Sequence, residues 1–133
     1  MSASVRRDVV ILACAISAGI HGALVPAHLD ESAAAGWAFA VSTAILALLA
    51  FALTRRPTAR LPLVLAAATL AGLLAAYALA ITTGLPLLHP EPEPVDGLAV
   101  FTKVIEAAGV VTAWSLLHGV RAVGLATPQT KGI

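Results

Sequence analysis

Four long apolar runs dominate this sequence and constrain its fold more than any other feature. They cover residues 9–28, 33–54, 61–83 and 98–120. Each is close to the ~20 residues that a helix needs to cross ~30 Å of hydrocarbon. Only 11% of the residues are charged and 59% are hydrophobic, whereas roughly 25% are charged in soluble domains. The sequence therefore predicts an all-α fold, a membrane four-helix bundle in which residues 1–133 form a single domain.

Charged residues alternate between the two ends of these predicted spans. In a four-span arrangement the acidic residues of the connections gather on one side, and nearly all the basic residues gather on the other. Cytoplasmic loops of membrane proteins are enriched in Lys and Arg, so the basic side predicts the cytoplasm. We expect a multi-pass protein of the plasma (inner) membrane with both termini cytoplasmic, an N-in/C-in topology. The basic residues are Arg6, Arg7, Arg55, Arg56, Arg60, Arg121 and Lys131; the acidic residues are Asp30, Glu31, Glu91, Glu93 and Asp96.

A proline-rich stretch, residues 84–97, separates the third run from the fourth. Proline lacks a backbone N–H and restricts the residue before it, so this stretch is predicted to be a long loop rather than a helix or a central strand. Its alternating Pro and Glu residues favour a stiff, extended backbone. We expect the loop to lie across the outer mouth of the bundle, as a lid or as a rigid connector.

Three ionisable residues, His21, Lys103 and Glu106, fall inside the predicted spans. Each costs at least ~2.5 kcal/mol in the bilayer unless it is paired or hydrated. His21 lies ~10 Å deeper than His28 on nearly the same helix face, and Glu106 lies ~12 Å below the outer end of its run. The two depths match. Lys103 precedes Glu106 by three residues, so the two side chains are predicted to pair, unless Lys103 extends outward to the interface.

These residues suggest a polar site that opens outward. Imidazole and carboxylate groups together suit a transition metal such as zinc, copper or iron. The same groups suit a proton relay or a pocket for a small ligand, and a hydrogen-bonded His21–Glu106 pair would also simply fix helix packing. The cofactor, if any, stays open. The candidate metal ligands are His21, His28, Glu31 and Glu106, and the further polar or ligand-binding candidates are His89, Asp96, Lys103 and Tyr77.

Three short motifs resemble those of small four-helix integral membrane proteins of high-GC Gram-positive bacteria, a largely uncharacterised group. They are the His-x6-His-x2-Glu spacing of residues 21–31, the Gly-Leu-Pro of residues 84–86 and the Glu-Pro-Val of residues 93–95. The resemblance covers nearly the whole chain and implies a fold and a topology rather than an activity. It also implies an acidic residue soon after the Gly-Leu pair of residues 97–98; Lys103 stands near that position, which weakens a site made of several carboxylates.

Several functional classes lack support in the sequence. It contains no HExxH motif, no glycine-rich phosphate loop and no Ser/His/Asp spacing, which argues against a classical enzyme. A net charge of +1 and the absence of a basic run with interleaved aromatics argue against nucleic-acid binding. Three hypotheses stay open: a metal-binding or ligand-binding protein, a non-catalytic accessory subunit of a larger membrane complex, and a small-solute or proton-coupled transporter. The expected partners are the lipid bilayer and either a homo-oligomer or such a complex.

Overall fold

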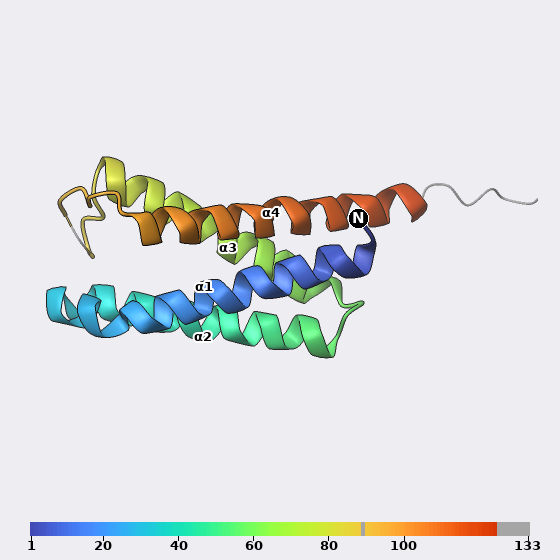
Figure 1. Cartoon of the computed structure of the whole chain (residues 1–133), viewed down its shortest axis with the longest axis horizontal. Coiled ribbons are helices and arrows are strands. Elements are labelled where there is room, and N and C mark those ends of the chain that lie inside the picture. Colours follow the sequence, from blue (N-terminus) through green and yellow to red (C-terminus); the bar gives the residue numbers. More distant parts are fainter. Residues whose placement is uncertain (89, 125–133) are drawn as a thin grey trace, which may run out of the picture.

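The computed structural model describes residues 1–88 and 90–124, with side chains described as far as residue 119. It contains four α-helices packed together (Figure 1). Each has at least 23 residues, or ~35 Å of helix, and a strongly apolar stretch, so each is long and apolar enough to cross a membrane. The all-α, four-span prediction is confirmed. The helices are α1 (Ala3–Glu31), α2 (Ala33–Arg55), α3 (Arg60–Thr82) and α4 (Gly97–Gly124).

A serine residue caps the N-terminus of each of the first two helices. Ser2 accepts a hydrogen bond from the Val5 N–H at the start of α1. Ser32 alone separates α1 from α2; its backbone is extended, and its hydroxyl accepts from the Ala35 N–H at 3.0 Å. A serine hydroxyl in this position satisfies one of the free amides of a helix N-terminus. The corner is therefore tight, and α2 returns antiparallel to α1.

Helix α1 differs from the predicted first span, because it begins six residues earlier and continues through Pro26 to Glu31. Pro26 removes the hydrogen bond that its N–H would have donated to the carbonyl of Gly22. Only about one turn follows Pro26, and this turn ends at the Ser32 corner. The polar residues His28, Asp30 and Glu31 therefore lie on α1 itself.

The four helices form two antiparallel hairpins that meet along α1 and α4. Helix α1 packs extensively against α2 and also against α4, whereas α3 packs mainly against α4. The chain N-terminus and the α2–α3 connection lie at one end of the molecule, called here the N-terminal end (Figure 1). The α1–α2 corner and the α3–α4 connection lie at the other, the strap end. The basic residues Arg6, Arg7, Arg55 and Arg56 thus share one end, and their membrane orientation is still the prediction of the positive-inside rule.

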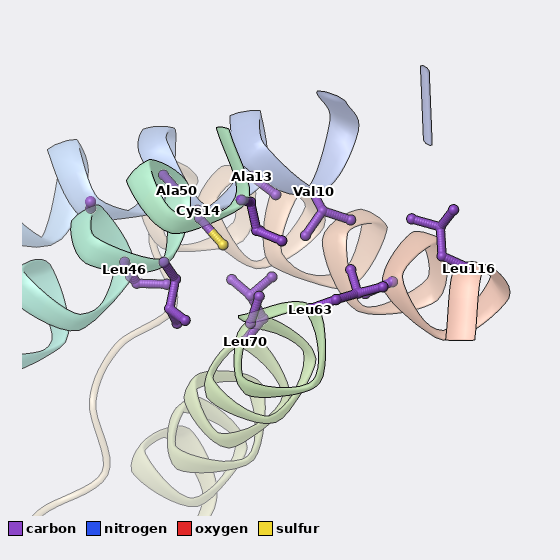
Figure 2. Packing of buried hydrophobic residues seen from close by; sticks show 13 residues of the cluster. Val10, Ala13, Cys14, Leu46, Ala50, Leu63, Leu70 and Leu116 are labelled. Carbon is purple, nitrogen blue, oxygen red and sulfur yellow. The ribbon is translucent and has the colours of Figure 1, made fainter. Parts of the chain in front are cut away.

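The half of the bundle next to the N-terminal end is called here the N-terminal half, and the half next to the strap end is the strap half. Tight apolar packing fills the N-terminal half (Figure 2). All four helices contribute to it, and small residues such as Ala13 and Ala66 let their backbones approach closely. The largest wholly buried apolar side chains are Val10, Leu46, Leu53 and Leu70. This core holds the four helices together in the N-terminal half.

Many large apolar side chains point outward. Such an apolar exterior would be a liability in water but matches a lipid environment. It supports embedding in a membrane. Examples on the four helices are Leu12, Leu48, Phe51, Leu65, Leu79, Val104 and Val111.

The α3–α4 connection, residues 83–96, is called here the strap. Gly84 turns it with a φ of +72°, in the left-handed region that favours glycine, and a β-carbon there would collide with the Pro90 carbonyl oxygen. The strap folds back onto α3, because the Glu93 N–H donates to the Ala80 carbonyl at 3.0 Å. It also reaches the other hairpin, since the Ser32 hydroxyl donates to the Leu88 carbonyl at 3.2 Å. The predicted long loop is confirmed.

Candidate functional site

Glu106 of α4 lies at the centre of a polar cluster inside the bundle. Its side chain is wholly buried, with 0% exposed. The Ser17 hydroxyl of α1 donates to Oε1 at 2.7 Å, and Lys103 Nζ donates to Oε2 at 2.7 Å. The Lys103–Glu106 pair spans three residues of one helix, as its spacing predicts. The carboxylate is therefore neutralised on one oxygen and hydrogen-bonded to the neighbouring helix on the other.

His21 joins this cluster through Ser17, one turn earlier on α1. Its Nδ1 lies 2.9 Å from the Ser17 carbonyl oxygen and 3.3 Å from the Ser17 hydroxyl. A carbonyl oxygen only accepts, so Nδ1 is assigned the proton. In the neutral imidazole the lone pair is then on Nε2. His21 and Glu106 share Ser17 as a common partner, at the matching depth that the sequence predicts.

His28 and Glu31 form a separate pair near the strap end. His28 Nδ1 lies 2.9 Å from Glu31 Oε2. The ring of Phe39, on α2, stacks on His28 with centroids 3.8 Å apart and lies tilted beside His21 with centroids 5.1 Å apart. One aromatic side chain thus contacts both imidazoles, and it holds the outer pair against α2.

The four candidate metal ligands divide into these two groups. Among the described residues, no three His, Cys, Asp or Glu side chains come together as a metal-ion site would require. The backbones of His21 and His28 are ~10 Å apart along one continuous helix, and the ring of Phe39 contacts both imidazoles. The geometry thus supports two separate groups: His21 and Glu106, which share Ser17, and the hydrogen-bonded pair of His28 and Glu31.

A cavity of about 400 Å³ has a residue of each group in its wall, His21 of the first and both His28 and Glu31 of the second. It lies in the strap half of the bundle and takes its lining from all four helices and from the strap. Its wall is mostly apolar, with side chains such as Leu24, Leu73 and Leu98. The polar and ionisable side chains of the lining are His21, His28, Glu31, Ser42, Tyr77, Glu93, Asp96, Thr102 and Lys103.

Two further candidates, Tyr77 and Lys103, lie together at the inner part of this wall. Lys103 Nζ lies 5.4 Å from the centroid of the Tyr77 ring, within the range of a cation–π contact. The buried Tyr77 hydroxyl has no hydrogen-bond partner in the described structure. An unsatisfied buried hydroxyl is unfavourable, so this group is available to a partner that enters the cavity.

The remaining candidates lie at the strap end or outside the described structure. Asp96 lines the cavity and accepts from the Ala99 N–H at 2.7 Å, so it also caps α4. His89 falls outside the described residues. Sequence reasoning did not identify Ser17 or Phe39, although both are central to the site. Ser17 lies four residues before His21, one helical turn away, and this spacing was the available signal.

Comparison with protein-family models, curated proteins and solved structures finds no match to this chain.

Proposed function

We propose that this four-span membrane protein binds a small, largely apolar ligand in the cavity of its strap half. The cavity itself carries the proposal. Its volume of about 400 Å³ falls within the ~300–1,000 Å³ typical of small-molecule sites. Such sites combine apolar walls with a few polar groups that orient the ligand, and this wall has that composition.

The described polar groups supply a way to orient a ligand at the inner end of the cavity. Lys103 has N–H groups beyond the one that it donates to Glu106, and Tyr77 has its unsatisfied hydroxyl. The buried Glu106 and Ser17 hold Lys103 in place from behind. A ligand with a hydroxyl or carbonyl oxygen would find donors there, and its apolar body would lie between the helices.

The packed N-terminal half favours binding over passage. Leu46, Leu53 and Leu70 fill the bundle beyond the cavity and are wholly buried (Figure 2). Transport of a solute would require these side chains to separate, whereas binding requires no rearrangement of the core. A transporter is therefore the more demanding hypothesis, and an accessory subunit would need no ligand at all.

A cavity-filling pair of variants tests the proposal. Ala76 lines the cavity, whereas its neighbour Ala75 is exposed on the outer surface of α3. We expect saturable binding of a fluorescent naphthyl alcohol by the wild type in lipid nanodiscs, after subtraction of empty nanodiscs. Ala76→Phe should weaken this binding at least tenfold, because the phenyl ring occupies the ligand volume, and Ala75→Phe should leave it unchanged. Absence of saturable binding would favour the accessory subunit.

Elemental analysis of the same preparations tests the metal hypothesis separately. Plasma mass spectrometry would compare the wild type with His21→Ala and with His118→Ala, which changes a histidine bonded to the Trp114 carbonyl in the opposite half. Near-stoichiometric zinc, copper or iron that is lost only in His21→Ala would replace the small-ligand proposal with a metal site. We expect the metal content of all three proteins to be equal and far below one ion per chain.

The rate at which the ligand dissociates should depend on the hydrogen bond between Ser32, at the α1–α2 corner, and Leu88 of the strap. Ser32→Gly removes the hydroxyl that donates to Leu88 but retains a residue that serves nearly as well at a helix N-terminus. A lost hydrogen bond of about 1 kcal/mol corresponds to about fivefold in rate, so the probe should dissociate about fivefold faster. Stopped-flow fluorescence measures this rate. The control is Thr54→Val, which removes a hydroxyl at the C-terminus of α2, far from the strap; the probe should dissociate from it at the wild-type rate.

A further inference from the structure

We infer that the occupant of the cavity is a small organic cation, with its charged group at the strap end and its apolar body between the helices. This inference rests on the proposed function, because it specifies the ligand of the same cavity. The charges of the cavity wall, their positions and their partners carry it.

The cavity wall carries an excess of negative charge. Among the described lining residues the carboxylates are Glu31, Glu93 and Asp96, and the one ammonium group is that of Lys103. Lys103 is already paired with the buried Glu106 at 2.7 Å, so this pair contributes no net charge. The field inside the cavity is therefore set by the three carboxylates.

These carboxylates come from three different segments and line one cavity. Glu31 ends α1, Glu93 lies in the strap, and Asp96 directly precedes α4. The chain contains no Lys or Arg in residues 26–40 or 76–102, the parts that build this end of the molecule. The strap end thus contributes three carboxylates, and no Lys or Arg from these parts of the chain, to the wall of the cavity.

The described hydrogen bonds position these carboxylates without supplying a Lys or Arg counter-charge. Glu31 pairs with His28, and Asp96 accepts from the Ala99 N–H. The backbone of Glu93 is held by its bond to the Ala80 carbonyl. A cleft with charges of one sign and with apolar, low-dielectric walls concentrates the field and attracts the opposite charge.

The apolar wall favours a cation that also carries an apolar body. A purely hydrophilic cation would gain nothing from Leu24, Leu73 and Leu98, whereas an organic cation buries its body against them. The Phe39 ring lies in the same wall and adds apolar surface. An anion would meet three carboxylates on entry and an already neutralised Lys103 within.

Three probes with one body and different charges test the inference: naphthylmethylammonium, naphthylmethanol and naphthoate. Binding would be measured in nanodiscs of zwitterionic lipid, so that the bilayer has no net charge preference. At low ionic strength we expect the ammonium probe to bind at least tenfold more tightly than the alcohol, and the carboxylate probe to bind more weakly than the alcohol. Salt should reduce the difference in affinity, because the strap-end carboxylates are partly exposed, as the 49% exposure of the Glu31 side chain shows.

A charge-neutralising variant assigns this preference to the cavity. Glu93→Gln/Asp96→Asn retains both side-chain sizes, and Asn caps a helix as well as Asp does. The ratio of the two affinities, ammonium probe over alcohol, should fall below threefold when both are measured on this variant. Asp8→Asn removes one negative charge near the start of α1, at the N-terminal end, and should keep the full preference.

The possible results separate the two proposals. Saturable binding of all three probes with equal affinity, or tightest binding of the carboxylate, would overturn the cation assignment and leave the ligand-binding function in place. A cation preference that survives in Glu93→Gln/Asp96→Asn would also overturn the assignment. Absence of saturable binding of any probe would overturn the proposed function itself.

Discussion

Replacement of Lys103 by methionine is expected to lower the free energy of unfolding by about 3–5 kcal/mol. The substitution keeps an unbranched side chain of similar length but removes the charge that neutralises Glu106. Glu106 is wholly buried, so its carboxylate would keep only the Ser17 hydroxyl as a described partner. A buried charge without its counter-charge is strongly unfavourable in a protein interior and in a bilayer. Reversible unfolding in mixed detergent micelles, followed by circular dichroism, measures this loss.

The double variant Lys103→Met/Glu106→Gln is the control for this prediction. It removes both charges, and the amide oxygen of Gln still accepts from Ser17. We expect it to recover most of the loss and to fall within about 1.5 kcal/mol of the wild type, because neutral replacement of a buried pair is often nearly neutral in stability. Glu106→Gln alone should cost less than Lys103→Met, since the Lys103 side chain is 16% exposed and lines the cavity. Additive effects of the two single substitutions would contradict a stabilising pair.

Gly109→Ala is expected to destabilise the bundle by about 1–3 kcal/mol. Gly109 lies on α4 where this helix contacts α1 and α3. A β-carbon at this position would lie 2.7 Å from the Ala13 β-carbon and 2.7 Å from Leu70 Cδ1. The Ala13 β-carbon cannot rotate away, so the helices themselves must move apart. Small residues allow such close approach in membrane bundles, and an added methyl group removes it.

Gly19→Ala is the matched control, because a β-carbon there meets nothing within 4 Å. Alanine is favoured over glycine in a helix interior by roughly 0.5–1 kcal/mol, so this variant should be as stable as the wild type or slightly more stable. Unfolding of both variants in the same detergent system gives the comparison. Equal stability of Gly109→Ala and Gly19→Ala would show that α4 does not pack against α1 and α3 as closely as described.

Local sequence features account for the helices and for the Lys103–Glu106 pair. The four apolar runs predict the four helices, since length and hydropathy alone decide whether a helix can cross a bilayer. The interval of three residues between Lys103 and Glu106 places their side chains on one helix face, and the structure confirms their contact. The prolines of residues 86–94 predict the strap, because proline removes backbone donors. The bounds of the first span were less well predicted, since α1 begins at Ala3 and ends at Glu31 rather than covering residues 9–28.

The partners of each polar group were decided by the tertiary structure. His21, His28 and Glu106 looked like one site because depth can be counted along a helix, but the rotation of one helix against its neighbour cannot. In the structure Glu106 instead accepts hydrogen bonds from Ser17 and Lys103. The ring of Phe39 contacts both imidazoles. The cavity depends on the same information, because it is formed where two hairpins diverge and no single segment encodes it. The sequence by itself thus determined which segments span the membrane and which residues are costly to bury there; only the packing of the helices decided how those residues are paired and where space is left for a ligand.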